Sequence, residues 1–242
     1  MIVISKIKSL LILAFVVLHF IGNTQITSGK IVFERKTNLF KKFAEPQTQK
    51  WIGEKNKWKY EDFELYFNDS ISLFIPAETA DSDKLSWTTN KNTVYQNLNK
   101  GSRISLLTVF GENFVIQDSL RKRTWKITEN RRTIAKFSCR QAIWQMDDST
   151  RIYAWYSEEI IPTVGPETYT GLPGAILGLA AEDGRIVYFA KSVEVMKPNF
   201  EKLIPKMNLK NATTDAELRS KMISQFGSKK EYMQLIVDLF IW

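Results

Sequence analysis

The chain has 242 residues, a formal net charge of +8 and a single cysteine, Cys139. One cysteine cannot form an internal disulfide, so the sequence excludes the disulfide-stabilised class of small secreted proteins, and the fold must rest on its apolar core. Lys and Arg are interleaved with Asp and Glu over most of the length, and no nucleic-acid-binding motif is present. Nucleic acid is therefore not an expected partner, whereas a mildly basic surface that faces anionic lipid or peptidoglycan is an alternative.

The first 24 residues have the layout of a secretory signal peptide. Two lysines give a positive start, apolar residues fill positions 10–21, and small residues follow at 22–24. The apolar run is shorter than the roughly 18–20 residues that span a bilayer as a helix. We therefore expect a signal peptide over 1–24 and an exported mature protein over 25–242. Its expected charge is +6, with no transmembrane span and no lipid-bearing terminal cysteine.

The mature sequence predicts a single β-rich domain. No repeat, low-complexity stretch or Pro/Ser/Gly-rich linker divides residues 25–242. Alternating apolar and polar residues over 29–39 predict a half-buried strand. Residues 41–59 have no clear period and are interpreted as a loop or a short helix. Two apolar runs then flank Asn68-Asp69-Ser70, which predicts a β-hairpin over 63–75.

Strand signals then follow at close, regular spacing, after a polar segment over 77–86 that is expected to form a loop. The expected strands cover residues 93–98, 103–110, 113–118, 124–128, 135–145, 151–156, 175–180 and 185–195. Turn-forming glycine and aspartate residues separate several of them. The series predicts a mainly β fold, namely a single curved antiparallel sheet or half-barrel without βαβ alternation.

The C-terminal tail, about 213–242, is predicted to be helical. Residues 213–217 offer an N-cap and an acidic first turn, and Gly227 offers a stop. Between them, apolar residues recur at helical spacing: Leu218, Met222, Ile223 and Phe226. Residues 229–242 are interpreted as a second helix. The two helices are expected to cover one face of the sheet.

Histidine chemistry is absent from the expected mature protein. The only histidine, His19, lies in the expected signal peptide. This excludes Ser-His-Asp and Cys-His catalysis and the common histidine metal sites. No nucleophile elbow, phosphate loop or dinucleotide fingerprint is present. We therefore expect no catalytic residue, no cofactor and no metal, and we interpret Cys139 as a buried, inert thiol rather than a redox or metal-binding one.

Carboxylates offer the one enzymatic alternative. Neighbouring residues of a strand point to opposite faces, so Asp147-Asp148 and Glu158-Glu159 are interpreted as turn and strand-end residues. Glu158, Glu159 or Glu167 are candidate acids of a carboxylate-based hydrolase only if two of them face one cleft with a raised pKa.

The most distinctive run of the sequence is rich in glycine and proline. It reads Trp155-Tyr156-Ser157-Glu158-Glu159-Ile160-Ile161-Pro162, then Gly165-Pro166, then Gly171-Leu172-Pro173-Gly174-Ala175-Ile176-Leu177. Glycine and proline at these positions fix a backbone path that other residues resist. The pattern predicts a tight crossing that leaves a strand at Ser157, makes a short turn or helix around 167–170, and enters the next strand at Ala175.

This run, together with Trp125-Lys126-Ile127 and residues 134–142, resembles the GLPGLI family of exported proteins from the Bacteroidetes group. The naming motif stands at 171–177, with Ala175 where the family usually has leucine. The resemblance is specific from about Trp125 to Val195. It implies a protein of the periplasm or outer-membrane periphery in a Gram-negative cell, with an outer-membrane TonB-dependent transporter as a partner. The strand layout is also similar to the lipoprotein-carrier fold, in which a curved sheet wraps around helices.

These observations favour an exported binding or accessory protein that is not an enzyme. The alternatives are a carboxylate-based hydrolase, a carrier of a lipid or other apolar ligand, and a structural role at the outer membrane. The expected ligand or partner surface consists of Trp155, Tyr156, Gly165, Pro166, Gly171, Pro173 and Gly174. The competing interpretation is that this run is a structural hinge, whose glycines serve backbone geometry alone.

Overall fold

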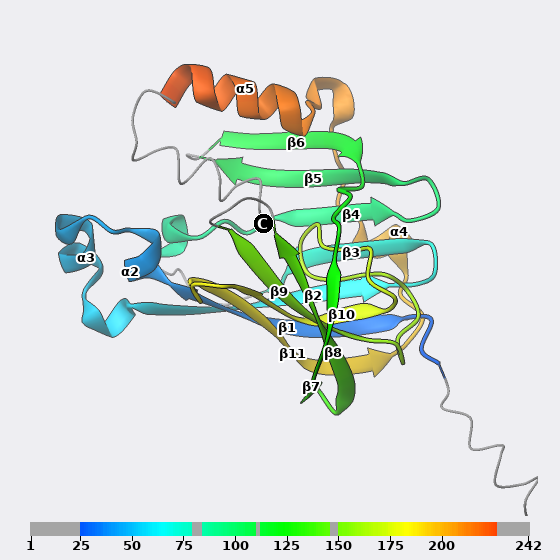
Figure 1. The fold of residues 1–242 in the computed structure, drawn as a ribbon. Helices are drawn as coiled ribbons and strands as arrows, with labels where there is room; N and C mark the ends of the chain where they lie inside the picture. Colours follow the sequence, from blue (N-terminus) through cyan, green and yellow to red (C-terminus); the bar gives the residue numbers. More distant parts are fainter. Residues whose placement is uncertain (1–24, 79–83, 110–111, 146–149, 227–242) are drawn as a thin grey trace, which may run out of the picture.

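The computed structural model describes residues 25–78, 84–109, 112–145 and 150–226. The expected signal peptide and the expected helix over 229–242 lie outside these residues, so both stay predictions. Eleven strands form one sheet whose neighbours are all antiparallel (Figure 1). The predicted mainly β class is confirmed. None of the helices in the described ranges has the length and apolar character needed to cross a bilayer.

The strands account for most of the regular structure. They are β1 (Gly29–Asn38), β2 (Trp58–Phe67), β3 (Ile71–Pro76), β4 (Thr93–Asn97), β5 (Ser102–Val109), β6 (Glu112–Ser119), β7 (Lys126–Ile134), β8 (Phe137–Gln145), β9 (Arg151–Ser157), β10 (Ala175–Ala181) and β11 (Ile186–Val195). The helices are short except for the last. They are α2 (Leu39–Lys42), α3 (Pro46–Ile52), α4 (Phe200–Leu203), α5 (Asp215–Phe226) and the 3-10 turns η1 (Glu54–Asn56), η2 (Ser86–Thr88) and η3 (Leu209–Asn211).

The strand order forces the sheet to curl. The order is β6-β5-β4-β3-β2-β1-β11-β10-β9-β8-β7, so the chain reaches one edge at β6 and continues at the opposite edge with β7. Eleven flat strands about 4.8 Å apart would separate these edges by roughly 48 Å. The link over 120–125 can span only roughly 25 Å. The sheet is therefore strongly curved, as Figure 1 shows.

Most of the predicted strands are confirmed, but the prediction over 124–145 needs correction. β7 continues to Ile134 and β8 begins only at Phe137, with a tight turn at Ala135-Lys136. Both turn residues have positive φ, 49° and 74°. Such turns usually contain asparagine or glycine. Because neither residue marks a turn in the sequence, a continuous strand from 135 was predicted wrongly.

The concave side of the sheet holds the core. Along β1, buried positions alternate with half-buried ones from Ile31 through Phe33, and β2 shows the same alternation through Phe63 and Leu65. Phe33 lies directly opposite Phe63 in the ladder, and Phe63 stacks on Phe74 of β3 at 5.0 Å. The curled sheet encloses this core together with residues 158–174, an irregular segment rather than the helices of the lipoprotein-carrier comparison.

The predicted tail helix over 213–227 is confirmed as α5. Its capping box is formed: Thr214 Oγ1 accepts a bond from the Glu217 backbone N–H, and Glu217 Oε2 accepts one from the Thr214 N–H. The helix lies along the edge strand β6 (Figure 1). Residue 213 forms an isolated parallel bridge with Ile116 of that strand. α5 thus lies beside the edge of the sheet, and Asp215 at its start also pairs with Arg103 of β5. The expectation that both tail helices cover one face stays a prediction, because the second lies outside the described residues.

Candidate functional site

The glycine-proline run forms an excursion between two paired strands. β9 ends at Ser157, and β10 begins at Ala175, directly opposite it in the ladder. Within the excursion, the backbone bonds back to β10: Ala175 N–H donates to Ile160 O, and Ile176 N–H donates to Val164 O, at 3.0 and 2.8 Å. The predicted tight crossing is thus present, and the segment is fastened along its length.

Three glycines of the run play different parts. At Gly174, φ is +138° and a Cβ would stand 2.1 Å from Ser157 O. At Gly165 a Cβ would stand 2.9 Å from Ile176 Cβ. At Gly171, φ is +91° but the nearest atom is 3.9 Å away. Gly165 and Gly174 are therefore required by close packing, whereas Gly171 is required only by its backbone angle.

The structure separates the seven residues of the expected binding surface. Tyr156 is buried on the concave side, whereas Trp155 faces the convex side and packs on Phe189 at 6.1 Å. Gly165, Pro166 and Gly174 are buried, whereas Gly171 and Pro173 are exposed. The seven therefore do not share one surface. Their role in binding stays a prediction, and their geometry favours the hinge interpretation.

A row of polar residues crosses the inner face at the centre of the sheet. Arg35 of β1 lies opposite Glu61 of β2 on one side and Tyr188 of β11 on the other. Its guanidinium bonds to Glu61 Oε2 at 2.6 Å and to Tyr188 OH at 3.3 Å. All three side chains are buried. Period-two alternation could have indicated this row, because Arg35 and Glu61 continue the buried positions of Phe33 and Phe63.

Glu167 caps this row from the enclosed segment. It is fully buried and adopts a left-handed φ of 55°. Tyr188 OH donates to its Oε1 at 2.7 Å, Asn92 Nδ2 donates to its Oε2 at 3.1 Å, and Arg35 lies 3.8 Å away. The strained backbone is thus held by side chains of β1 and β11 and by Asn92, which directly precedes β4.

Burial and charge act in opposite directions on the two glutamates. Burial raises the pKa of Glu167, and the opposing attraction of Arg35 and the bonds from Tyr188 and Asn92 do not cancel this effect. Burial also raises the pKa of Glu61, but Arg35 and Lys59 outweigh it, so that this pKa falls below its usual value. Burial further raises the pKa of Tyr188 well above its usual value. Arg35 is thus the shared cation of two buried carboxyl groups whose pKa values are shifted in opposite directions.

A second polar group ties the β6–β7 link to the enclosed segment. Arg123 donates to Thr168 O at 2.8 Å and to Thr168 Oγ1 at 2.9 Å, and its guanidinium lies 3.9 Å from the ring centroid of Tyr169. Burial lowers the pKa of Arg123 to about 10. Trp125 Nε1–H donates to Thr170 O at 3.1 Å. The link that joins the sheet edges therefore also holds the segment inside.

The candidate catalytic acids do not meet. Glu158 accepts a bond from Tyr156 OH, Glu159 accepts one from the Ser138 N–H, and Glu167 accepts bonds from Tyr188 and Asn92. Neither cavity described below is lined by any of the three. Within the described ranges, no group of three or more His, Cys, Asp or Glu side chains could hold a metal. Cys139 is buried, and burial raises the pKa of its thiol to about 11, which fits the inert interpretation.

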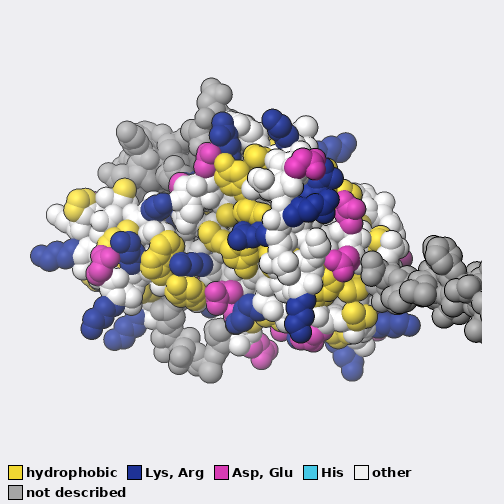
Figure 2. Space-filling model, turned by 60° about the horizontal axis from the view of Figure 1, so that its bottom comes forward, with side chains coloured by type: hydrophobic (Ala, Val, Ile, Leu, Met, Phe, Trp, Pro, Cys, Tyr) yellow, Lys and Arg dark blue, Asp and Glu magenta, His cyan; other side chains and the backbone are white. Residues whose placement is uncertain are grey.

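The exposed aromatic side chains gather at one end of the molecule. Trp51 of α3, Trp58 and Tyr60 of β2, and Trp87 of η2 have exposed fractions of 63, 38, 55 and 54%. We call these four residues the aromatic end; it lies at the left of Figure 1, beside α2 and α3. Lys36 stands 4.1 Å from the Trp58 ring centroid on the convex face. Figure 2 shows the molecule with the lower side of Figure 1 turned forward, and apolar side chains on this face lie in small groups separated by lysine and arginine.

A shallow cavity of about 390 Å³ lies at the aromatic end. Its lining residues are Glu45, Gln47, Thr48, Trp51 and Trp87. The two indole rings are 5.6 Å apart and tilted by 54°, and Phe43 lies 5.4 Å from Trp87 on the other side. The loop or short helix predicted over 41–59 is confirmed by α3 and η1, but no site is expected there, since the segment has no period that separates exposed from buried aromatics.

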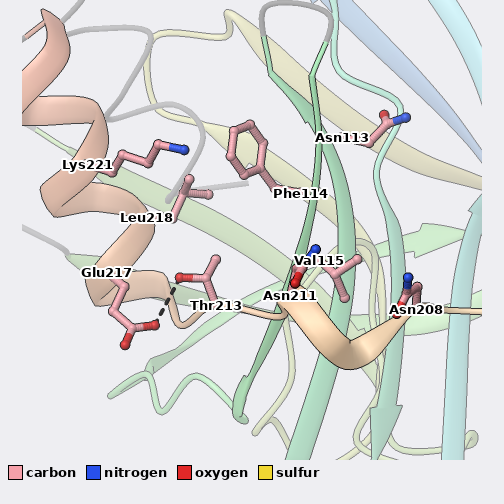
Figure 3. A pocket seen from close by; sticks show the side chains of 9 residues that line it. All are labelled: Asn113, Phe114, Val115, Asn208, Asn211, Thr213, Glu217, Leu218 and Lys221. Atoms are coloured by element: carbon pink, nitrogen blue, oxygen red, sulfur yellow. Dashed lines mark hydrogen bonds between the residues drawn. The ribbon is translucent and has the colours of Figure 1, made fainter.

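A second cavity, of about 430 Å³, lies between β6 and α5 (Figure 3). It is lined by Asn113, Phe114, Val115, Asn208, Asn211, Thr213, Glu217, Leu218 and Lys221. The bond from Thr213 Oγ1 to Glu217 Oε2 belongs to the start of α5, and Asn208 caps η3. Several of its polar groups thus already serve the local fold.

The comparisons with known proteins agree with the fold and leave the function open. A family described as "Protein of unknown function (Porph_ging)" matches residues 144–178, a span that contains the glycine-proline run. This match is consistent with the expected Bacteroidetes resemblance. No curated protein matches the sequence.

Among solved structures, the chain is similar to PNGF-II. In one crystal form the TM-score is 0.56 at 14% identity, over 80% of this chain and 32% of that one. In another form the values are 0.53 and 16%, over 75 and 30%. The chain thus spans about a third of the length of PNGF-II. At such identity the likeness concerns the fold alone.

Proposed function

We propose that the chain is an exported, non-enzymatic binding or accessory protein of a Gram-negative envelope, and that it binds on its outside, at the aromatic end. The observation that carries this proposal is the filled interior of the sheet. Residues 160–177 and the Arg35–Glu167 row occupy the concave side where a carrier of this general shape would hold an apolar ligand. Ion pairs and buried polar groups make that interior a poor site for an acyl chain.

The exposed aromatic end supports the outer location. Four large aromatic side chains exposed at one end of a molecule form apolar surface in contact with water, and such surface often marks an interaction site. Trp and Tyr are also the residues that most often dominate the binding energy of interfaces. The resemblance to the GLPGLI family further suggests an outer-membrane TonB-dependent transporter as the neighbour in the envelope.

The proposal is tested by cosedimentation of the purified protein with envelope fragments of its own cell. The double variant Trp51→Ala/Trp87→Ala is compared with Trp155→Ala, which removes an indole of the glycine-proline run instead. We expect the double variant to bind at least about tenfold less and Trp155→Ala to bind like the wild type. Loss of binding in Trp155→Ala alone would move the site to that run.

The carrier alternative is tested on the same preparation. Native mass spectrometry of the purified protein should show the mass of the polypeptide without a bound lipid. A stoichiometric lipid or other apolar molecule would overturn the proposal in favour of a carrier.

A further inference from the structure

We infer that the cavity between Trp51 and Trp87 is a subsite for a neutral saccharide. This inference rests on the proposed function, because it names the class of ligand that the aromatic end binds. A pyranose ring carries C–H groups on its faces and hydroxyl groups around its rim. A matching site therefore needs an exposed aromatic face beside hydrogen-bonding side chains, and these two elements meet in this cavity.

The aromatic element is exposed but held in place. Trp51 and Trp87 are both more than half exposed. On the α3 side, Gln49 Nε2 donates to the carbonyl oxygens of Phe40 and Phe43 at 2.9 and 3.0 Å, which fixes α3 against α2. The neighbouring Ile52 is buried. Trp51 therefore stands on a fastened helix.

The support of Trp87 is equally well defined. The Lys59 ammonium donates to Leu85 O at 2.6 Å from inside the sheet, and Thr88 Oγ1 donates to the same oxygen at 2.6 Å. Thr88 itself is fully buried. Two indoles on fastened supports lose little conformational freedom when a ligand binds, which favours binding to a flat partner.

The polar element supplies the complementary groups. Glu45 offers a carboxylate, Gln47 offers an amide with donors and an acceptor, and Thr48 offers a hydroxyl. Thr48 Oγ1 donates to Glu45 Oε2 at 2.9 Å, which orients the carboxylate. Sugar hydroxyl groups can donate to the carboxylate and accept from the amide. The cavity volume of about 390 Å³ falls within the range of small-molecule sites, roughly 300–1,000 Å³.

The charge of the lining favours a neutral sugar over a membrane surface. Of the described residues that line the cavity, the only charged one is Glu45. A carboxylate at this position repels uronic acids and anionic lipid headgroups. A membrane-docking surface would instead combine its indoles with lysine and arginine, as Lys36 and Trp58 do on the convex face nearby.

The test uses the full mature chain and soluble oligosaccharides of known structure. The probes are chitotetraose, cellotetraose, maltotetraose, mannotetraose and xylotetraose, with tetragalacturonate as the acidic comparison. Binding is measured by calorimetry and by saturation-transfer NMR, because both readouts are independent of the indoles that the variants remove. We expect saturable binding of at least one neutral oligosaccharide and at least tenfold weaker binding of tetragalacturonate.

Matched variants locate the site. Trp51→Ala and Trp87→Ala should each weaken binding of that oligosaccharide about tenfold or more. Ile127→Ala, which removes an exposed apolar side chain of β7 outside the aromatic end, should leave the affinity unchanged. Circular dichroism checks that all three variants keep the fold. The inference is overturned if no neutral probe binds, or if Trp51→Ala and Trp87→Ala bind the oligosaccharide as tightly as the wild type does.

The failure of this inference differs from the failure of the proposed function. If no oligosaccharide binds, but Trp51→Ala/Trp87→Ala still reduces cosedimentation with envelope fragments, the aromatic end binds another class of partner. Phosphatidylglycerol vesicles then test whether that partner is a lipid surface. If the double variant cosediments like the wild type, the proposed function itself is wrong.

Discussion

The segment over 158–174 and the aromatic end both hold side chains in unusual environments. The segment buries polar side chains, whereas the aromatic end exposes apolar ones. Within the segment, Glu167 is enclosed, accepts bonds from Tyr188 of β11 and from Asn92 just before β4, and pairs with Arg35 of β1. At the aromatic end, Trp51 and Trp87 remain more than half exposed although their backbones are fastened. The geometry of the most distinctive part of the sequence therefore favours an architectural role, while an inconspicuous part offers the proposed binding surface.

The largest expected effect comes from the glycines of the enclosed segment. Gly174→Ala adds a Cβ that would stand 2.1 Å from Ser157 O, so we expect a loss of stability above about 4 kcal/mol, or no stable fold. Gly171→Ala meets open space and only the strain of its positive φ, which costs about 1–3 kcal/mol. Urea unfolding followed by tryptophan fluorescence measures both. Equal losses in the two variants would contradict the packing role of Gly174.

Removal of the central cation should be nearly as damaging. Arg35→Met leaves Glu61 and Glu167 without their shared guanidinium in a buried setting, and we expect a loss of about 3–5 kcal/mol at neutral pH. Arg151→Met is the control, because its pair with Glu182 is about half exposed and contributes less than about 1 kcal/mol. The loss in Arg35→Met should shrink at acidic pH, where the orphaned carboxyl groups take up protons. A loss that does not depend on pH would show that packing, not charge, decides the effect.

A smaller, pH-dependent effect is expected at α5. Burial raises the pKa of Asp215, but the bonds and charges of Arg121 and Arg103 outweigh it, so that the folded pKa lies below its usual value. A lowered folded pKa contributes stability above the unfolded pKa of about 3.9, and this contribution is lost as the pH falls through the folded pKa. α5 should therefore loosen from β6 below about pH 4.

Hydrogen exchange of the α5 amides across pH 3–6, corrected for the intrinsic pH dependence, measures this loosening. In Asp215→Asn the ion pairs are absent at every pH, so the protection of α5 should be lower at pH 6 and nearly constant down to pH 3. The same protection profile in the wild type and in Asp215→Asn would exclude the ion pairs as the cause.

The smallest effect on stability is expected at the aromatic end. Trp51→Ala and Trp87→Ala remove side chains that are mostly exposed, so each should change the free energy of unfolding by less than about 1 kcal/mol. Their effect on binding is expected to be large, as argued above. A loss of several kcal/mol in either variant would assign these indoles to the fold and remove the contrast between the two regions.

Sequence patterns captured the sheet because its strands are half-buried. The alternation through Ile31 and Phe33 predicts a strand, and Asn68-Asp69-Ser70 predicts a turn. Both predictions depend only on residues that are neighbours in the chain. The turn at Ala135-Lys136 was missed because its positive φ values are imposed by the pairing of β7 with β8. The excursion over 158–174 was predicted from its glycines, but its enclosure depends on contacts with β1, β4 and β11, which no local pattern encodes.

The candidate site was less accessible to sequence reasoning. Tyr156 and Trp155 are neighbours on one strand and therefore point to opposite faces of the sheet. The same rule implies that they cannot both belong to one binding surface. Trp51 and Trp87 lie far apart in the chain and approach each other only because α3 and η2 dock at the same end of the sheet. Exposure of an indole is a property of the assembled fold, and the sequence around residues 41–59 has no periodicity that would reveal it.

The pairing of β1 with β11 has a consequence for the order in which the chain folds. Gly29 lies opposite Val195, and Thr37 lies opposite Ile186. A chain that is synthesised from its N-terminus can therefore form the ladder between β1 and β11 only after residues up to Val195 are available. Contacts of such large sequence separation slow folding. β1 can pair early with β2 on one side, but its other edge stays unpaired and the sheet stays open until β11 is available.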